Sequence, residues 1–215
     1  MKHEDSTWGE IIDATHEHQR LDYVWRYSSI PVLTKENVST HSYWVAIYSI
    51  LIHQKIAPKN YDLLNACVMH ALMHDYVEGV TGDIVRTFKY SSLKLKSAID
   101  EAENEIIKSM DASAQMMFRL SDELLEKSGN AEYVKAIVKT ADFISLYNYM
   151  TREYSRGNRE ILPFYERMIS DLKMMWESSE AIKISVSPDE LATEFNPKEI
   201  YEQLHCMARQ LIGLD

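Results

Sequence analysis

Apolar residues recur at the spacing of an α-helix along most of the chain, and polar breaks separate the repeats. Capping-box spacing from Thr7 to Glu10 opens the first repeat, and Ser39 is the expected N-cap of the second. Pro58 ends the second repeat and Gly79 the third. The sequence therefore predicts helices over roughly residues 7–20, 39–57, 61–77, 92–110, 114–128, 131–155 and 159–179, and a last helix opened by Asn196 and Pro197.

One segment has the character of a strand. Residues 181–187, AIKISVS, could form a short extended piece, but one isolated strand would have no partner. The chain contains 6 glycines and 5 prolines, which leaves few places for the tight turns of an all-β fold. Its 215 residues show no repeat or interdomain linker and match the length of one domain. We therefore expect an all-α protein in which residues 1–215 form a single domain.

The charge and composition of the chain restrict the classes of partner that it can bind. The net charge of −10 disfavours binding to a nucleic-acid polymer, because that affinity comes mainly from clustered lysine and arginine. A small phosphorylated ligand needs only a local cation. Cys67 and Cys206 are too few and too far apart for a disulfide framework or a cysteine-based zinc site. No apolar run approaches the roughly 20 residues that span a bilayer. We expect a cytoplasmic protein that binds neither membranes nor nucleic-acid polymers.

Histidine and acidic side chains stand out on the predicted helices. His74 and Asp75 are adjacent near the end of the third helix and offer a nitrogen and an oxygen to one divalent cation. His41 opens the second helix, and Asp142 lies inside the apolar helix 131–155. A carboxylate there is expensive to bury unless a cation or hydrogen bonds compensate it. The order His, His-Asp, Asp therefore indicates a metal centre, and Asp142 is its strongest indication.

Three stretches and one arginine resemble a known family. TKENVSTHS at 34–42, HDYVEGVTGDI at 74–84, KTADFISLYNYM at 139–150 and Arg26 occur in the order and at separations similar to those of the HD-domain phosphohydrolases. Within that family, the chain resembles the bacterial 5'-deoxynucleotidases and the related phage deoxynucleotide (dATP) triphosphohydrolases. The resemblance covers about residues 20–160. It implies an HD-type helical bundle over this core, with the helices of residues 161–215 packing on it.

The resemblance also implies a role for each matching residue. One divalent cation (cobalt, manganese, zinc, magnesium or iron) would be bound by His41, His74, Asp75 and Asp142. Such a cation lowers the pKa of bound water and neutralises phosphate oxygens. Glu78 would be the general acid or base, and Asp83 would lie beside the sugar and the metal-bound water. Arg26 would contact the phosphate. Tyr27 stands where relatives often carry tryptophan against the nucleoside.

The chain departs from the family around the substrate. Thr40 stands where relatives often have glutamate, and residues 84–89, IVRTFK, replace a loop that contains more proline. Arg86 and Lys89 in this segment either contact the additional phosphates of a triphosphate or are solvated charges, and we favour the solvated interpretation. The metal set is intact, so the difference concerns the substrate that the site accepts.

Several functions fit these residues. The preferred one is hydrolysis of a deoxynucleoside 5'-monophosphate to deoxynucleoside and phosphate, and the alternative is release of triphosphate from a dATP-type substrate. A non-catalytic nucleotide-binding HD module is a third hypothesis, which the presence of Glu78 disfavours. A two-metal HD oxygenase or phosphodiesterase would need further ligand histidines between Asp75 and Asp142, where the sequence has none. The resemblance also implies a homodimer or higher homo-oligomer.

Two neighbouring features have simpler explanations. His70 precedes His74 by four residues and faces the same side of the helix, but we expect it to pack in the core or behind the ligands. Tyr147, Tyr149 and Tyr154 follow Asp142 and either line a pocket or form a helix contact. Helical spacing alone does not separate those two alternatives.

Overall fold

A computed structural model describes residues 18–184 and 193–214 of the chain. The first predicted helix, residues 7–20, lies almost entirely outside these residues. The described part begins with a short 3-10 helix, η1, at Gln19–Tyr23. A loop of irregular structure then leads from Val24 to the first long helix.

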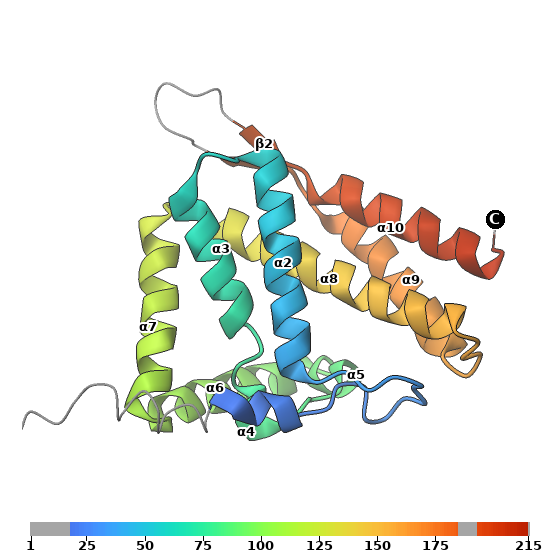
Figure 1. Ribbon diagram of the computed structural model, residues 1–215, viewed down its shortest axis with the longest axis horizontal. Coiled ribbons are helices and arrows are strands. Elements are labelled where there is room, and N and C mark those ends of the chain that lie inside the picture. The colour runs from blue at the N-terminus through green and yellow to red at the C-terminus, as the bar shows by residue number, and fades with distance from the viewer. Residues whose placement is uncertain (1–17, 185–192, 215) are drawn as a thin grey trace, which may run out of the picture.

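Helices make up most of the described chain, which confirms the all-α class (Figure 1). Among these helices, none combines the length and apolarity needed to cross a membrane. Their bounds are α2 Val38–Ile56, α3 Tyr61–Met73, α4 Glu78–Thr81, α5 Arg86–Lys89, α6 Leu93–Ser109, α7 Ala112–Lys127, α8 Ala131–Ser155, α9 Leu162–Ser178 and α10 Pro197–Ile212.

The N-cap of helix α2 lies two residues earlier than predicted. Its N-cap is Asn37, whose side chain accepts a hydrogen bond from the backbone N–H of Thr40, so the prediction of Ser39 as N-cap is wrong. Ser39 lies inside the first turn, and its hydroxyl bonds to the side chains of Asp22 and Asn37. Asparagine and serine are comparable N-caps, and sequence spacing did not separate them. His41 keeps its predicted place in the first turn.

Helix α3 is shorter than predicted. It ends at Met73 rather than near Val77, because the backbone changes from four-residue to three-residue hydrogen bonds. The N–H of Tyr76 donates to the carbonyl of Met73, and that of Glu78 to the carbonyl of Asp75. This tighter winding is that of a 3-10 turn. His74 and Asp75 therefore lie just after the helix, where the chain turns toward α4.

The extended segment at 181–187 does have a partner. Ile182–Ile184 forms strand β1, which pairs antiparallel with β2, Thr193–Phe195, with Ile182 opposite Phe195. The prediction that this segment would lack a partner is wrong, because the second strand lies just before α10 and has no strand pattern of its own. Phe195 is buried in the core beside α2 and α8. This small hairpin leaves the all-α class unchanged.

Helix α8 lies in the middle of the bundle. Helices α2 and α3 pack against it on one side, and α9 and α10 pack against its C-terminal half (Figure 1). Helix α7 covers α3, and η1, α4, α5 and α6 gather near the end where α2 begins. The apolar core lies on both sides of α8. The side that faces α2 and α3 includes Val45, Leu63, Cys67 and Ile137. The side that faces α9 and α10 includes Phe143, Tyr165, Leu172 and Tyr201. This arrangement places the start of α2, the end of α3 and the middle of α8 at one point.

Candidate metal centre and phosphate site

Two imidazoles and a carboxylate from three helices meet where α2 begins. His41 lies in the first turn of α2, His74 directly follows α3, and Asp142 lies in the middle of α8. Each offers one ligand atom, and these atoms all lie within 4.8 Å of one another. Nε2 of His41 is 3.3 Å from Oδ1 of Asp142. The structure thus brings three of the four predicted metal ligands into one cluster.

Asp75, the fourth predicted ligand, borders this cluster. Its Oδ2 lies 3.1 Å from Nε2 of His74 and 3.5 Å from Nε2 of His41. The same oxygen accepts a hydrogen bond from Nη1 of Arg26 at 3.2 Å. Asp75 therefore faces both imidazoles and joins them to the arginine that was predicted to hold phosphate.

The two imidazoles present the same nitrogen to the cluster. Nδ1–H of His74 donates to the carbonyl oxygen of Ala71 at 2.6 Å, and Nδ1 of His41 lies 3.1 Å from the hydroxyl of Ser145. Both Nε2 atoms are buried, and neither has a hydrogen-bond partner of good geometry among the described residues. Oxygen contacts at Nδ1 orient an imidazole so that Nε2 can bind a metal. The donor set therefore fits one divalent cation.

The pKa values of the clustered side chains determine which of them are ready to bind a metal. Burial raises the pKa of Asp75 and of Asp142, but the neighbouring histidines outweigh it, so both carboxyl pKa values lie below their ordinary range. Burial lowers the pKa of His74, but Asp75 and Asp142 raise it to about 9. Burial, assisted by Arg26, lowers the pKa of His41 to about 4, which keeps this imidazole neutral. Two carboxylates and the neutral His41 imidazole are already in the protonation states that ligate metals, whereas His74 would release its proton when a metal binds.

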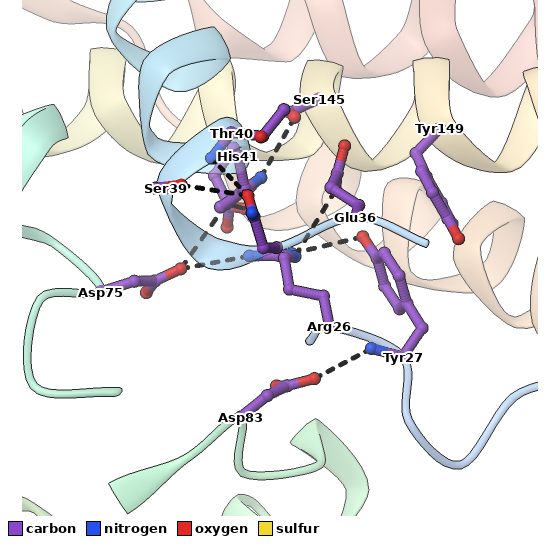
Figure 2. Close-up of polar contacts among 12 residues, drawn as sticks. Arg26, Tyr27, Glu36, Ser39, Thr40, His41, Asp75, Asp83, Ser145 and Tyr149 are labelled. Carbon is purple, nitrogen blue, oxygen red and sulfur yellow. Dashed lines mark hydrogen bonds and ion pairs between the residues drawn. The ribbon is translucent and has the colours of Figure 1, made fainter. Parts of the chain in front are cut away.

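Arg26 links the cluster to its surroundings (Figure 2). Besides its bond to Asp75, Nη2 donates to the hydroxyl of Tyr27 at 3.2 Å, and Nε lies 3.7 Å from Oε2 of Glu36. Glu36 is buried, and burial raises its pKa more than Arg26 and Arg152 lower it. Because three groups fix the guanidinium, its planar fork is held beside the metal cluster. A fork in this position suits the oxygens of a phosphate.

Tyr27 and Asp83, both predicted to lie at the substrate, contact each other. The backbone N–H of Tyr27 donates to Oδ2 of Asp83 at 3.0 Å (Figure 2). Tyr27 has a φ of 59°, which is uncommon for a residue other than glycine. Burial raises the pKa of its phenol to about 12, so the hydroxyl keeps its proton. Asp83 therefore holds the backbone next to Arg26, a role that the sequence did not indicate.

Glu78, the predicted general acid or base, is the first residue of α4. Its Oε2 is buried without a hydrogen-bond partner among the described residues. Burial raises its pKa to about 8, and the charges of Asp75 and Asp83 add to this effect. A carboxyl group with this pKa holds a proton at neutral pH. Such a group is suited to give that proton to a leaving oxygen.

In the segment after Asp83, Lys89 has an ion-pair partner. Nζ of Lys89 lies 2.6 Å from Oε1 of Glu103 in α6, and both side chains are half-buried. Lys89 is therefore ion-paired rather than simply solvated, and α6 balances its charge. Arg86 begins α5. Among the interactions found for the described side chains, Lys89 has no contact with the metal cluster.

Several residues of the site were not assigned to it from the sequence. Ser145 and Lys139 lie three residues after and before Asp142 on α8, and helical spacing could have identified both as neighbours of the cluster. Nζ of Lys139 lies 3.4 Å from Oδ2 of Asp142. Glu36 and Tyr149 join the site only because the loop before α2 folds back on α8. Local spacing carries no information about that contact.

The helical fold and its His/Asp cluster are those expected from the resemblance to the HD-domain phosphohydrolases. A crystal structure of an HD-domain phosphohydrolase from Listeria innocua has the same fold, with a TM-score of 0.59 over 78% of this chain and 82% of that chain, at 22% identity. A family model described as 5'-deoxynucleotidase YfbR-like matches residues 16–186. The chain belongs to this YfbR-like 5'-deoxynucleotidase family, whose members are hydrolases acting on phosphoric esters.

Curated relatives agree with this assignment. A 5'-deoxynucleotidase from Yersinia pseudotuberculosis is 31% identical over 162 residues, which are 71% of this chain and 79% of the relative. A 5'-deoxynucleotidase from Yersinia pestis is 31% identical over 158 residues, 69% of this chain and 77% of the relative. The resemblance inferred from the motifs is thereby confirmed.

Proposed function

We propose that this protein hydrolyses deoxynucleoside 5'-monophosphates to deoxynucleosides and phosphate. The observation that carries the proposal is the convergence of two buried Nε2 atoms with Asp75 and Asp142 directly beside Arg26. A metal-binding donor set and a phosphate-binding cation are thus next to each other. Membership of the 5'-deoxynucleotidase family supports the choice of substrate.

One divalent cation would be held by His41, His74, Asp75 and Asp142. When bound, such a cation supplies a nucleophile at neutral pH and neutralises charge on the phosphate. Nitrogen and carboxylate ligands are compatible with zinc, manganese, cobalt and iron, so the donor set leaves the metal's identity open. Lys139, paired with Asp142, offsets part of the negative charge of the ligands.

The other residues bind the phosphate and transfer a proton. Arg26 would hold two phosphate oxygens and offset the charge that develops on phosphorus. Glu78, protonated at neutral pH, would donate its proton to the 5'-oxygen of the deoxynucleoside as the phosphorus–oxygen bond breaks. The leaving group then departs as a neutral alcohol. Asp83 would keep Tyr27, and with it Arg26, in place for this step.

The local charge favours a monophosphate over a triphosphate. Acidic groups surround Arg26: the described site contains Asp75, Asp142, Glu36 and Asp83. Lys89 is paired with Glu103 and is not held ready for a further phosphate. A triphosphate brings more negative charge than this site balances. Release of triphosphate from a dATP-type substrate therefore remains the second candidate.

The decisive experiment compares two substrates. The purified protein is incubated with dAMP and with dATP in the presence of each of several divalent metals, and the products are separated by chromatography. We expect deoxyadenosine and phosphate from dAMP. Triphosphate release from dATP without hydrolysis of dAMP would replace the proposal by its alternative. No turnover of either nucleotide with any metal would support a non-catalytic nucleotide-binding module.

We propose that residues 1–215 act as one HD-type unit, because α9 and α10 pack on α8. A cytoplasmic location, the absence of nucleic-acid partners and a homodimer or higher homo-oligomer are predictions from the sequence. Size-exclusion chromatography with light scattering measures the oligomeric state directly.

A further inference from the structure

The loop between η1 and α2 carries Arg26 and Tyr27 and is closed at its base. Trp25 and Asn37 form an isolated β-bridge, in which the N–H of Arg26 donates to the carbonyl of Glu36 at 2.9 Å. The N–H of Val38 donates to the carbonyl of Val24 at 3.0 Å. The two ends of the loop are thus fixed to each other. The position of the loop residues between these two ends depends on the part of the protein that the loop contacts.

The far side of this loop is bound by the C-terminal half of α8. The carboxylate of Glu153 accepts hydrogen bonds from the backbone N–H groups of Leu33 and Thr34, at 2.6 and 2.9 Å. The hydroxyl of Tyr149 donates to the carbonyl of Thr34 at 2.7 Å. These bonds hold the polypeptide backbone rather than its side chains. They explain why the loop lies against α8, but they do not reach Arg26.

The ring of Tyr149 provides the connection to Arg26. It stacks on the ring of Tyr27 with 4.5 Å between centroids and 19° between planes (Figure 2). Tyr149 is 1% exposed, so its own ring is fixed by the core. The Tyr27 hydroxyl accepts a hydrogen bond from Nη2 of Arg26 at 3.2 Å, and the guanidinium lies 5.2 Å from the Tyr27 ring centroid. A continuous series of contacts therefore runs from α8 to the guanidinium.

We propose that Tyr149 is a positioning residue for substrate phosphate. By stacking on Tyr27 it fixes the phenol whose hydroxyl holds Arg26, so that the guanidinium points at Asp75, which borders the metal cluster. This inference rests on the proposed function for the role of Arg26. Of the three tyrosines after Asp142, it gives one a role at the site: Tyr149 acts through Tyr27.

The hydroxyl of Tyr27 is essential to this arrangement. A tryptophan at the same position can stack on Tyr149, but its indole N–H is only a donor and cannot accept a hydrogen bond from a guanidinium. Tyr27 supplies both a ring for the stack and an acceptor for Arg26. The contact between Tyr27 and Arg26 is therefore specific to a chain with tyrosine at this position.

The test compares variants that separate the ring from its hydroxyl. Tyr149→Leu removes the stack, Tyr149→Phe keeps the ring but removes the bond to Thr34, and Tyr27→Phe removes the acceptor for Arg26. Tyr165→Leu is the matched control, because Tyr165 is an equally buried tyrosine of the same core side without a ring contact to Tyr27. The readouts are KM and kcat for dAMP, the Kd of inorganic phosphate by calorimetry, and Tm.

We expect Tyr149→Leu and Tyr27→Phe to raise KM and the phosphate Kd about 2- to 10-fold, the range expected for loss of one aromatic pair or hydrogen bond. Tyr149→Phe should restore most of the phosphate affinity, and Tyr165→Leu should lower Tm without changing KM. Unchanged KM and phosphate affinity in Tyr27→Phe would overturn the proposal, even if Tyr149→Leu does not fold. So would equal effects of Tyr149→Leu and Tyr165→Leu. A parent protein that neither binds phosphate nor hydrolyses dAMP would instead overturn the proposed function.

Discussion

The backbone N–H of Tyr27 donates a hydrogen bond to the carboxylate of Asp83 over 3.0 Å. The two residues are far apart in sequence, and Tyr27 has a φ of 59°. Conformations that are rare for a residue of this size persist only where surrounding contacts enforce them. The bond to Asp83 is one such contact, and it lies directly beside the arginine proposed to bind phosphate.

Removal of this bond should destabilise the loop. We expect Asp83→Ala to lower the free energy of unfolding by about 1–3 kcal/mol, because a part-buried N–H loses a charged acceptor. Asp83→Asn keeps an acceptor oxygen and should recover most of this loss. Urea denaturation of the two variants and the parent measures the difference. Equal destabilisation by Ala and Asn would show that the hydrogen bond to Tyr27 contributes little.

Metal binding should stabilise the folded protein. A ligand that binds only the folded state at about 100 times its Kd adds about 2.7 kcal/mol. For a protein of this size that corresponds to a rise in Tm of roughly 5–10 °C. We expect the rise with Mn²⁺, Co²⁺ or Zn²⁺ in the parent, its reversal by a chelator, and its loss in His74→Ala. Thermal scans with and without metal provide the measurement.

His70→Ala is the matched control for this experiment. His70 lies one helical turn before His74 on α3 and is half-buried, but it is not part of the cluster of ligand atoms. Its replacement should leave the response of Tm to metal intact. A response that disappears in His70→Ala and persists in His74→Ala would contradict the proposed ligand set.

The residues of the site were predicted from the sequence better than the contacts between them. Asp142 could be identified because a carboxylate inside an apolar helix needs compensation, and His41 because it opens a helix. These two residues approach His74 only because α2 and α3 pack on α8. The order of the motifs predicts that packing only through the resemblance to the family. The predicted boundaries agree best for α8, whose apolar pattern is long and lacks a competing cap.

Several contacts that the sequence did not predict are made by backbone groups. Glu153 binds two N–H groups of a loop that lies 119 and 120 residues earlier, and no side-chain pattern in that loop marks the contact. The early end of α3 has the same origin, since the three-residue hydrogen bonds after Met73 involve backbone atoms alone. Strand β2 was missed because only three residues form it.

Glu78 should give the activity an alkaline limit. Burial and nearby carboxylates raise its pKa to about 8, and a cation at the cluster lowers it from there by favouring the charged form. As a general acid it acts while protonated, so kcat should fall as pH rises through a value at or below about 8. Glu78→Gln should lower kcat by about 10²- to 10⁴-fold and remove this limb. A kcat that rises through the same pH range in the parent would assign Glu78 the role of base instead.

Glu153 should make stability depend on pH in the acidic range. Burial raises the pKa of Glu153, but hydrogen bonds from Leu33, Asn158 and Thr34 lower it below its ordinary value. A carboxyl whose pKa is lower in the folded state stabilises the protein above its unfolded pKa, and this contribution is lost as pH falls through the folded pKa.

We expect Glu153→Gln to lower the free energy of unfolding by about 1–3 kcal/mol at pH 7, because one backbone N–H loses its acceptor. The gap to the parent should narrow as pH falls below the ordinary pKa of a glutamate and through the lower folded pKa, whereas the exposed control Glu166→Gln should stay within about 0.5 kcal/mol of the parent throughout. A gap that does not narrow as the pH is lowered would mean that the charge of Glu153 does not hold the loop against α8.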